Sequence, residues 1–227
     1  MRCRVVAYNI RGFRDDVEAL GRIVRDLHPD VLLLNETGAR WRLRRFARVH
    51  GFEAATDPWT PLRRRAKDAV LVRPPWRITE HRQERFAGSA FLYPRAALIA
   101  DLDRERRHLL AVAIHLGLHP AERRRHVDEI LETLGDGRDP VVIGGDMNER
   151  PEGRAMTRLA KSLPDAWTRA GEGPGDTIPA TAPVARIDYV FTSPGIDVVR
   201  AWVPDGADVA VASDHRPVVA DLDIPDG

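Results

Sequence analysis

The sequence predicts an α/β protein in which two mixed β-sheets pack together and helices cover them. Short apolar runs typical of strands are numerous, whereas only a few segments carry apolar residues at helical spacing. Several connections between successive strands are short, and a purely parallel sheet would need a long crossover for each pair. The 227 residues lie at the upper edge of one domain and nothing marks a split, so residues 1–227 are predicted to form a single domain.

The amino-terminal part is predicted to alternate strand and helix. The expected segments are a strand at 4–8, a helix at 15–27, a strand at 31–34 and a helix at 41–49. The first helix is indicated by Val17, Leu20 and Val24 at helical spacing, and His28-Pro29-Asp30 ends it. The second strand is apolar throughout, which is typical of a strand covered on both faces.

The rest of the chain is predicted to be richer in strands. Expected strands lie at 69–72, 90–93, 97–99, 109–114, 141–143, 187–191 and 218–222. One helix is expected from Pro120 to its cap at Gly135, and a shorter one places Ala155, Met156 and Leu159 inward. The Gly/Pro-rich stretch 171–183 is interpreted as a loop.

The composition is that of a globular protein in a reducing compartment. The sequence is 43% hydrophobic and 30% charged. Its single cysteine, Cys3, excludes an internal disulfide framework. The amino terminus enters an apolar strand at once, without room for a signal-peptide core, and no apolar run approaches the ~20 residues of a membrane span. We therefore expect a cytoplasmic protein without a membrane span, and a monomer.

The net charge of +1 gives no overall signature of polyanion binding, but arginine is clustered. The clustered residues are Arg40, Arg42, Arg44, Arg45, Arg48, Arg63, Arg64 and Arg65. Local positive patches can steer a phosphate-bearing ligand even when the total charge is near zero. A genome that favours arginine over lysine is the alternative explanation.

Polar side chains stand at the ends of five predicted strands. They are Asn9, Glu36, His115, Asp146 with Asn148, and Asp214 with His215. Each has an ordinary alternative, such as turn chemistry, a solvated rim carboxylate, a buried structural histidine or a helix cap. Their joint occurrence favours a site, because carboxylates, imidazoles and amides are what a divalent metal ion and a phosphate ester require.

The segment 141–148 is the most specific of these motifs. Gly144 and Gly145 let the backbone turn sharply and approach a ligand. Asp146 and Asn148 can project from the same side of an extended segment, so the acid could take a proton from water while the amide donates to a phosphoryl oxygen. Asp188 lies inside a predicted strand, where a carboxylate is costly unless paired, and a histidine is its natural partner.

Taken in order, these motifs resemble those of the endonuclease/exonuclease/phosphatase superfamily, which has the DNase I-like fold. The corresponding segments are Tyr8-Asn9, Leu33-Leu34-Asn35-Glu36, Ile114-His115-Leu116-Gly117, Gly145-Asp146-Met147-Asn148, Arg186-Ile187-Asp188-Tyr189-Val190 and Ser213-Asp214-His215-Arg216-Pro217. Asn35 departs from the glutamine usual in the family. The resemblance runs from Val5 to Leu222. It implies a four-layer α/β/β/α sandwich, with two packed mixed sheets flanked by helices, and phosphoester hydrolysis with Mg²⁺ or Mn²⁺.

The resemblance also implies a role for each motif residue. Glu36 would be the principal metal ligand, with Asn9 and Asp214 completing the metal neighbourhood. Asp146 would orient and deprotonate the attacking water, with Asn148 helping to hold it. His115 and His215 would contact the non-bridging oxygens, and Asp188 would pair with His215, fix its tautomer and raise its pKa. The proton source for the leaving oxygen stays open between His115 and a water at the metal.

Some residues depart from particular branches of the family. Arg11 stands where abasic-site endonucleases often have an acid, and their active-site tyrosine has no obvious counterpart, which argues against a dedicated abasic-site repair role. Arg11, Arg123 and Arg216 are instead candidates for binding substrate phosphate. For Arg123 a solvated helix face is the alternative.

The leading functional hypothesis is a metal-dependent nuclease acting on DNA or RNA phosphodiesters. The arginine clusters favour it, with Trp41, Phe46 and Trp59 available to stack on bases. A phosphatase or phosphodiesterase for a small molecule or lipid headgroup is the alternative, favoured by the compact chain and the modest charge. A non-catalytic binding protein on the same fold is the third possibility.

Overall fold

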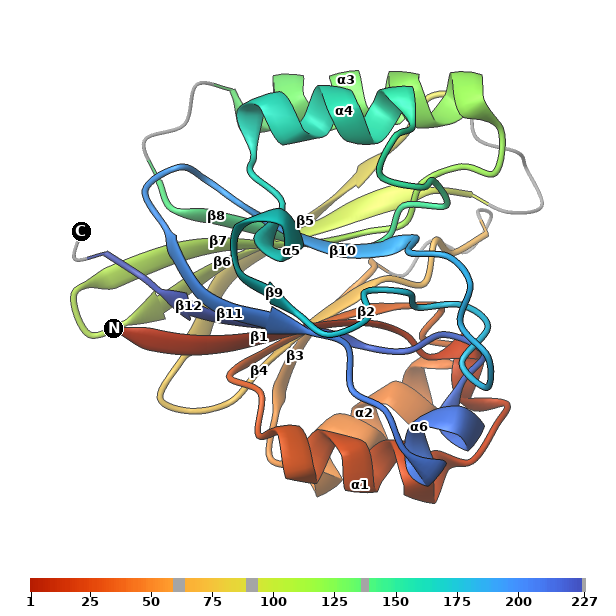
Figure 1. The fold of residues 1–227 in the computed structure, drawn as a ribbon. Coiled ribbons are helices and arrows are strands. Elements are labelled where there is room, and N and C mark those ends of the chain that lie inside the picture. Colours follow the sequence, from red (N-terminus) through yellow and green to blue (C-terminus); the bar gives the residue numbers. More distant parts are fainter. Residues whose placement is uncertain (59–63, 89–93, 136–138, 226–227) are drawn as a thin grey trace.

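The computed structural model describes residues 1–58, 64–88, 94–135 and 139–225. Two β-sheets pack face to face and helices lie outside both of them, which gives four layers (Figure 1). The predicted α/β/β/α sandwich is confirmed. Within the described residues, no helix is long and apolar enough to cross a membrane.

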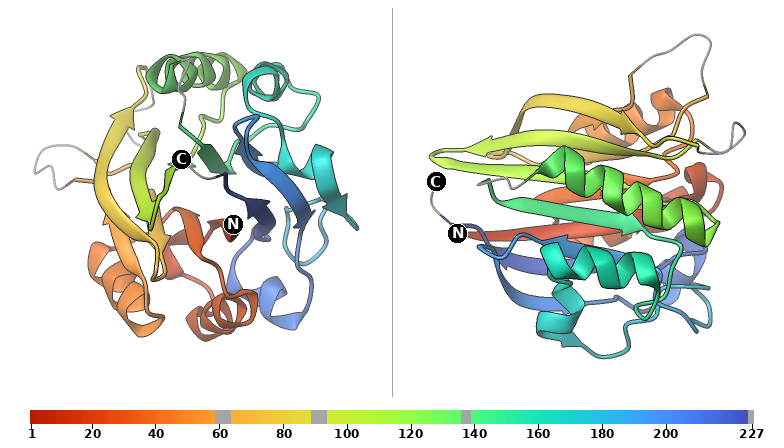
Figure 2. Two further views of the ribbon diagram at one scale, coloured as in Figure 1. Left: turned by 90° about the vertical axis from the view of Figure 1, so that its left-hand side faces the viewer. Right: turned by 90° about the horizontal axis from the view of Figure 1, so that it is seen from above.

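The seven-stranded sheet contains both ends of the chain. Across the sheet its strands are β3 (Glu53–Thr56), β4 (Ala69–Val72), β2 (Val31–Asn35), β1 (Arg2–Asn9), β12 (Val218–Asp223), β11 (Asp197–Trp202) and β9 (Gly171–Glu172). The central strand β1 runs parallel to β2 and antiparallel to β12. The termini therefore lie together at one end of the sandwich, as Figure 2 shows, where the Met1 amino group donates to Ile224 O at 2.8 Å.

The five-stranded sheet is also mixed. Its order is β10 (Asp188–Thr192), β8 (Val141–Asp146), β7 (Arg107–Ile114), β6 (Ala96–Arg104) and β5 (Arg77–Arg85). Strands β7 and β8 are parallel, with helix α3 (Pro120–Leu134) between them in the chain, and the other neighbours are antiparallel. Antiparallel neighbours need only short connections, in agreement with the mixed sheets expected from the sequence.

The remaining helices are η1 (Arg11–Phe13), α1 (Val17–Leu27), α2 (Arg40–Val49), α4 (Arg154–Ser162), α5 (Ala166–Ala170) and α6 (Ala207–Ala212). Helices α1, α2 and α6 cover the outer face of the seven-stranded sheet, whereas α3 and α4 cover that of the five-stranded sheet. The Asp16 side chain caps α1 by accepting hydrogen bonds from the N–H groups of Glu18 and Ala19, both at 2.9 Å.

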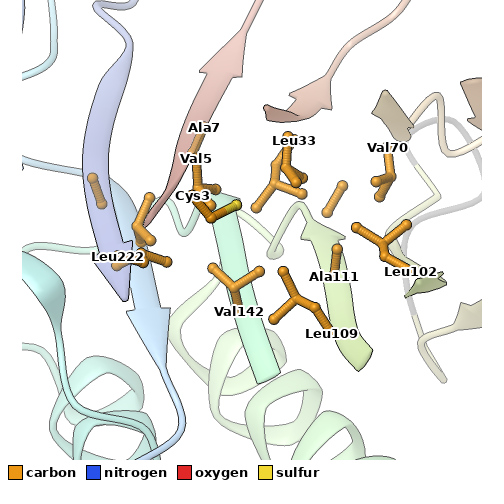
Figure 3. Close-up of a cluster of buried hydrophobic side chains, with 14 of the residues drawn as sticks. Cys3, Val5, Ala7, Leu33, Val70, Leu102, Leu109, Ala111, Val142 and Leu222 are labelled. Atoms are coloured by element: carbon orange, nitrogen blue, oxygen red, sulfur yellow. The ribbon is translucent and has the colours of Figure 1, made fainter. Parts of the chain in front are cut away.

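Burial on both faces explains the uninterrupted apolar runs. In β2, Val31 and Leu33 point between the two sheets, whereas Leu32 and Leu34 point toward the helices. Figure 3 shows Leu33 in the inter-sheet core together with Cys3 and Val142. Each such side chain contributes about 1.5–3 kcal/mol on burial, so both faces of the central strands stabilise the sandwich.

The predicted strands that fall within the described residues are present. The strand expected at 90–93 lies outside the described residues, because residues 89–93 are not among them. Strands β3, β5, β9 and β11, together with η1, α5 and α6, were not predicted. Strand β9 forms the first two residues of the stretch 171–183 that was interpreted as a loop, because these residues pair with β11 at the edge of the sheet. In β5 every residue is exposed or half-buried, and the strand pairs only with β6 at the edge of its sheet, so its sequence lacks the apolar pattern of a central strand.

Candidate active site

Two sheets bring the strand-end residues together at the end of the sandwich opposite the termini. Asn9 pairs with Asn35 where β1 and β2 end, and Asp146 pairs with Asp188 where β8 meets β10. A pocket of about 440 Å³ lies there. Its lining includes Glu36, His115, Asp146, Asn148 and His215, with the basic residues Arg11, Arg14, Arg65, Lys67 and Arg95. A larger cavity, about 760 Å³, lies between α1 and α2 and contains none of these acidic or imidazole groups.

Asp146 is the centre of the polar network. Its Oδ2 accepts a hydrogen bond from Asn9 Nδ2 at 3.1 Å and lies 3.2 Å from His115 Nε2 and 3.8 Å from His215 Nε2. Its Oδ1 accepts from the backbone N–H of Asn148 at 2.9 Å. Burial alone would raise the pKa of Asp146, but the hydrogen bond from His115, the charge of His215 and the Asn148 N–H hold that pKa below its ordinary value. The carboxyl group is therefore ionised at neutral pH.

Asp188 and His215 form the hydrogen bond expected from the sequence. His215 Nδ1 lies 2.8 Å from Asp188 Oδ2, and both side chains are buried. Burial would lower the pKa of His215, but the charge and hydrogen bond of Asp188, helped by Asp146 and Asp214, raise that pKa to about 9. The imidazole is therefore cationic at neutral pH, with Nδ1–H toward Asp188 and Nε2–H toward the pocket.

Glu36 and Asn9 lie beside Asp146, and the backbone at Glu36 is strained. Asn9 Nδ2 is 3.4 Å from Glu36 Oε1, so the Glu36 and Asp146 carboxylates converge on the same amide. Glu36 has a positive φ of 52°, and its carbonyl accepts the Gly12 N–H at 2.6 Å. Such backbone persists only where the surroundings hold it, and it often marks a functional site.

The other predicted metal and phosphate ligands have partners of their own. Asp214 Oδ2 lies 3.3 Å from Arg11 Nε, and the Asp214 side chain is 43% exposed. Arg123 lies on α3, where its Nε donates to Glu149 Oε1 at 3.1 Å and its Nη1 donates to Leu118 O at 2.6 Å. Arg216 Nε donates to Ala180 O at 2.7 Å. Neither Arg123 nor Arg216 is among the residues that line the pocket, whereas Arg11 is.

Asn35 and Asp68 support the site and were not predicted to do so. Buried Asn35 accepts the Asp146 N–H on its Oδ1 at 2.9 Å, and its Nδ2 donates to Asp68 Oδ1 at 2.8 Å and to Ile114 O at 3.0 Å. Burial raises the pKa of Asp68 well above its ordinary value, although the Asn35 hydrogen bond opposes this. Gly145, with φ of 142°, passes so close to Asn35 and Ile114 that a Cβ would collide with both. In the sequence, only the departure of Asn35 from the usual glutamine of the glutamate motif pointed to these supporting residues.

The donor set fits a hard divalent cation. Within the described residues, the one group of at least three acidic or imidazole side chains whose ligand atoms lie within 4.8 Å of one another is Asp146, Asp188 and His215. This buried group could bind a metal ion, but the cationic His215 has no free lone pair for it. The Glu36 carboxylate instead supplies the oxygen chemistry that Mg²⁺ and Mn²⁺ prefer. The neighbouring Asn9 turns its Nδ2 toward Glu36 and Asp146, and its Oδ1 accepts the Arg11 N–H at 3.1 Å.

The fold and the site together define a phosphoesterase scaffold of the DNase I-like class. The sequence profile of the Endonuclease/Exonuclease/phosphatase family matches residues 6–215, and the chain belongs to this family. Members of the family hydrolyse phosphoesters. A search of curated proteins gave no match.

Solved structures resemble the chain over nearly its full length. An endonuclease/exonuclease/phosphatase from Bacteroides vulgatus has a TM-score of 0.86 at 18% identity, with 99% of this chain and 100% of that chain covered. A mannosyl-6-phosphatase from Bacteroides thetaiotaomicron has a TM-score of 0.78 at 15% identity, covering 98% and 100%. TDP2 from C. elegans has a TM-score of 0.78 at 21% identity, covering 98% and 75%. At these identities the likeness establishes the fold.

Proposed function

We propose that the chain is a divalent-metal-dependent phosphoester hydrolase that cleaves phosphodiesters of DNA or RNA. One observation supports this above all others. The ionised, buried carboxylate of Asp146 meets the amide of Asn9 and two imidazole Nε2 atoms in a pocket whose rim carries arginine and lysine. An anionic ester entering this pocket would find a base for water and N–H donors for its oxygens in one place.

In this proposal Asp146 orients the attacking water and accepts its proton as the new P–O bond forms. Asn148 is held against Asp146 by its backbone N–H, and its Nδ2 donates to Leu116 O at 3.1 Å, so its side chain is positioned at the pocket. The Nε2–H groups of His115 and His215 donate to the non-bridging oxygens, where negative charge grows in the transition state. Asp188 keeps the His215 ring oriented and cationic.

Glu36 and Asn9, with Asp214, would hold the Mg²⁺ or Mn²⁺ ion, which when bound supplies Lewis-acid stabilisation of the phosphoryl charge. Asp214 would have to exchange its present Arg11 partner for the ion. Arg11 lines the pocket and would then be released to bind substrate phosphate. Phosphate binding by Arg123 and Arg216 stays a proposal, because both residues are held by the partners described above and neither lines the pocket.

The arginine-rich segment supports nucleic-acid binding in part, although its Trp41 and Arg42 line the cavity between α1 and α2 and not the site pocket. Trp41 at the start of α2 is 63% exposed, and the Arg42 guanidinium lies 5.4 Å from its ring centre, which suits stacking on a base. Arg40 and Arg65 from the same clusters, however, both pair with the one buried carboxylate of Asp57, which offsets one of their two positive charges. Trp59 and Arg63 lie outside the described residues.

A small-molecule phosphoester is the second candidate substrate. It is favoured by the fold shared with a mannosyl-6-phosphatase and by a pocket, about 440 Å³, of the size that encloses small ligands. The net charge of +1 also leaves the protein without the broad positive field of a high-affinity duplex binder. The chemistry at Asp146 would be the same for both substrates.

A panel of phosphoesters with Mg²⁺ or Mn²⁺ tests the proposal. It should include single-stranded DNA, duplex DNA, RNA, mononucleotides, sugar phosphates and lipid headgroups. We expect cleavage of an oligonucleotide that falls by about 10²–10⁴-fold in Asp146→Asn and by about 10²–10³-fold in His215→Ala. Turnover of phosphomonoesters with oligonucleotides left intact would select the second candidate.

Metal binding has its own readout. Mg²⁺ or Mn²⁺ should raise the Tm of the native protein, since a ligand of the folded state stabilises it, and should do so much less for Glu36→Ala. Glu80→Ala, which removes an exposed carboxylate on β5, is the matched control and should keep the full shift. If no phosphoester is hydrolysed and neither metal shifts the Tm, the protein is a non-catalytic binding protein instead.

A further inference from the structure

The two imidazoles of the site present the same ring atom to the same oxygen but have opposite partners behind them. The Nε2 atoms of His115 and His215 lie 3.2 Å and 3.8 Å from Asp146 Oδ2. Behind His215, Nδ1 lies 2.8 Å from a carboxylate oxygen of Asp188. Behind His115, Nδ1 lies 2.9 Å from Nη1 of Arg95, which is a guanidinium nitrogen.

A guanidinium group can only donate hydrogen bonds and stays protonated in proteins. Nδ1 of His115 must therefore accept from Arg95, and the proton of the ring must sit on Nε2. We propose that Arg95 is a positioning residue that fixes this tautomer of His115. The ring then acts as a hydrogen-bond donor to the substrate and not as the proton source for the leaving oxygen. This inference deepens the proposed phosphoesterase function and rests on it for its catalytic meaning.

The strand register holds Arg95 in place for this contact. Arg95 directly precedes β6, and its carbonyl accepts the Phe86 N–H at 3.1 Å. The next residue, Ala96, accepts the backbone N–H of His115 at 3.4 Å, so the two segments run side by side at this point. His115 is 2% exposed, and water therefore competes little for its Nδ1. The sheet thus places the backbone of Arg95 within reach of the buried His115 ring.

The occupied Nδ1 restricts what His115 can do during the reaction. If Nε2 gave up its only proton, the ring would become an imidazolate, which is inaccessible at neutral pH. If the ring first took a second proton at Nδ1, the hydrogen bond from Arg95 would be lost. His115 therefore keeps its proton throughout, and its Nε2–H turns from Asp146 to a phosphoryl oxygen. Of the two proton sources that the sequence leaves open, this disfavours His115.

The tautomer can be read directly by NMR. Protein labelled with ¹⁵N-histidine, without added metal, is examined by long-range ¹H–¹⁵N correlation, and His115 is assigned by its absence in His115→Gln. In the native protein we expect Nε2 to be protonated and Nδ1 to be unprotonated. Arg95→Met should shift the ring toward a mixture with Nδ1–H, whereas Arg95→Lys, which keeps a donor-only cation, should preserve the native tautomer.

Arg106→Met is the matched control, because Arg106 lies exposed in the β6–β7 turn at the far end of the strands. It should leave both the tautomer and the turnover unchanged, while Arg95→Met lowers kcat by about 10-fold or more and Arg95→Lys recovers part of it. A native His115 protonated at Nδ1, or an Arg95→Met protein with the native tautomer, would overturn the inference. If Arg95→Met does not fold, the native spectrum and Arg95→Lys decide. A protein that shows the expected tautomer but hydrolyses no phosphoester would refute the proposed function alone.

Discussion

Acid should weaken the fold at His126, a buried histidine on α3 that the catalytic proposal does not use. Its side chain is fully buried and stacks on Phe86 with ring centres 4.5 Å apart. Its Nδ1 accepts the Gly117 N–H at 3.3 Å, and its Nε2 has no hydrogen-bond partner among the described residues. Burial, with smaller contributions from Arg125 and Arg95, lowers the pKa of His126 from 6.5 to about 4.

The sign and the size of the effect follow from this pKa. The folded state holds His126 neutral, so the unfolded chain takes up the proton first as the pH falls below 6.5. The contribution of neutral His126 to the free energy of unfolding is fully present above pH 6.5 and is lost as the pH falls toward about 4. Each pH unit in this window is worth about 1.36 kcal/mol, so the loss is about 2 kcal/mol at pH 5 and about 3 kcal/mol below the folded pKa.

Urea unfolding at pH 7 and pH 5 measures this loss. The comparison protein is His126→Asn, whose amide oxygen can still accept from Gly117 but does not titrate. Other carboxyl groups contribute equally to both proteins and cancel in the difference. Between pH 7 and pH 5 the native protein should lose about 2 kcal/mol more than the variant, and about 4–8 °C more in Tm for a chain of this size. Equal losses in the two proteins would refute the reasoning.

Three further predictions concern residues that support the site. Arg123→Ala and Glu149→Ala should each lower the free energy of unfolding in urea by about 3–5 kcal/mol, because either change leaves one partner of a buried ion pair without the other. The double variant should lose little more than either single variant, and additive losses would contradict the pairing. Asp68→Asn keeps an oxygen that can accept from Asn35, so it should unfold at nearly the same urea concentration as the native protein. Asp68→Ala should lower the free energy of unfolding by about 1–3 kcal/mol, and equal urea midpoints for the two variants would disprove this. Gly145→Ala should destabilise the fold by more than about 4 kcal/mol or prevent folding, as judged by circular dichroism and Tm, and a native-like Tm would show that the backbone there can move.

The parts of the fold that could be predicted are those whose burial produces a continuous run of apolar residues in the sequence. Strands β1, β2, β7 and β8 are covered on both faces along their central residues, so those residues are constrained to be apolar and the run itself signals a strand. Strand β5 is held by hydrogen bonds to β6 at a sheet edge, with mostly exposed side chains. Its existence depends on a partner that lies elsewhere in the sequence, and no local pattern reports it.

The same distinction applies to the site. Asn9, Glu36 and Asp146 could be predicted to meet because strand ends converge at one edge of each sheet. Asn35 and Asp68 act through side-chain contacts that join distant segments, such as the bond from the Asp146 N–H to Asn35. Such contacts leave no periodicity in the sequence. The arginines were ambiguous for a related reason, since a charge on a helix is equally compatible with a ligand and with an ion pair.

The site geometry depends on the packing of the two sheets, because its halves come from different sheets. Asn9 and Asn35 end strands of the seven-stranded sheet, whereas Asp146 ends a strand of the five-stranded one, and hydrogen bonds of 3.1 Å and 2.9 Å join them across the interface. Directly beneath, a Cβ on Gly144 would lie 3.0 Å from side-chain atoms of Ala7 and of Leu33. Close approach of the sheets at Gly144 is therefore what lets Asn9 reach Asp146, and a bulkier residue in this part of the core would separate the base from the metal ligands without touching either.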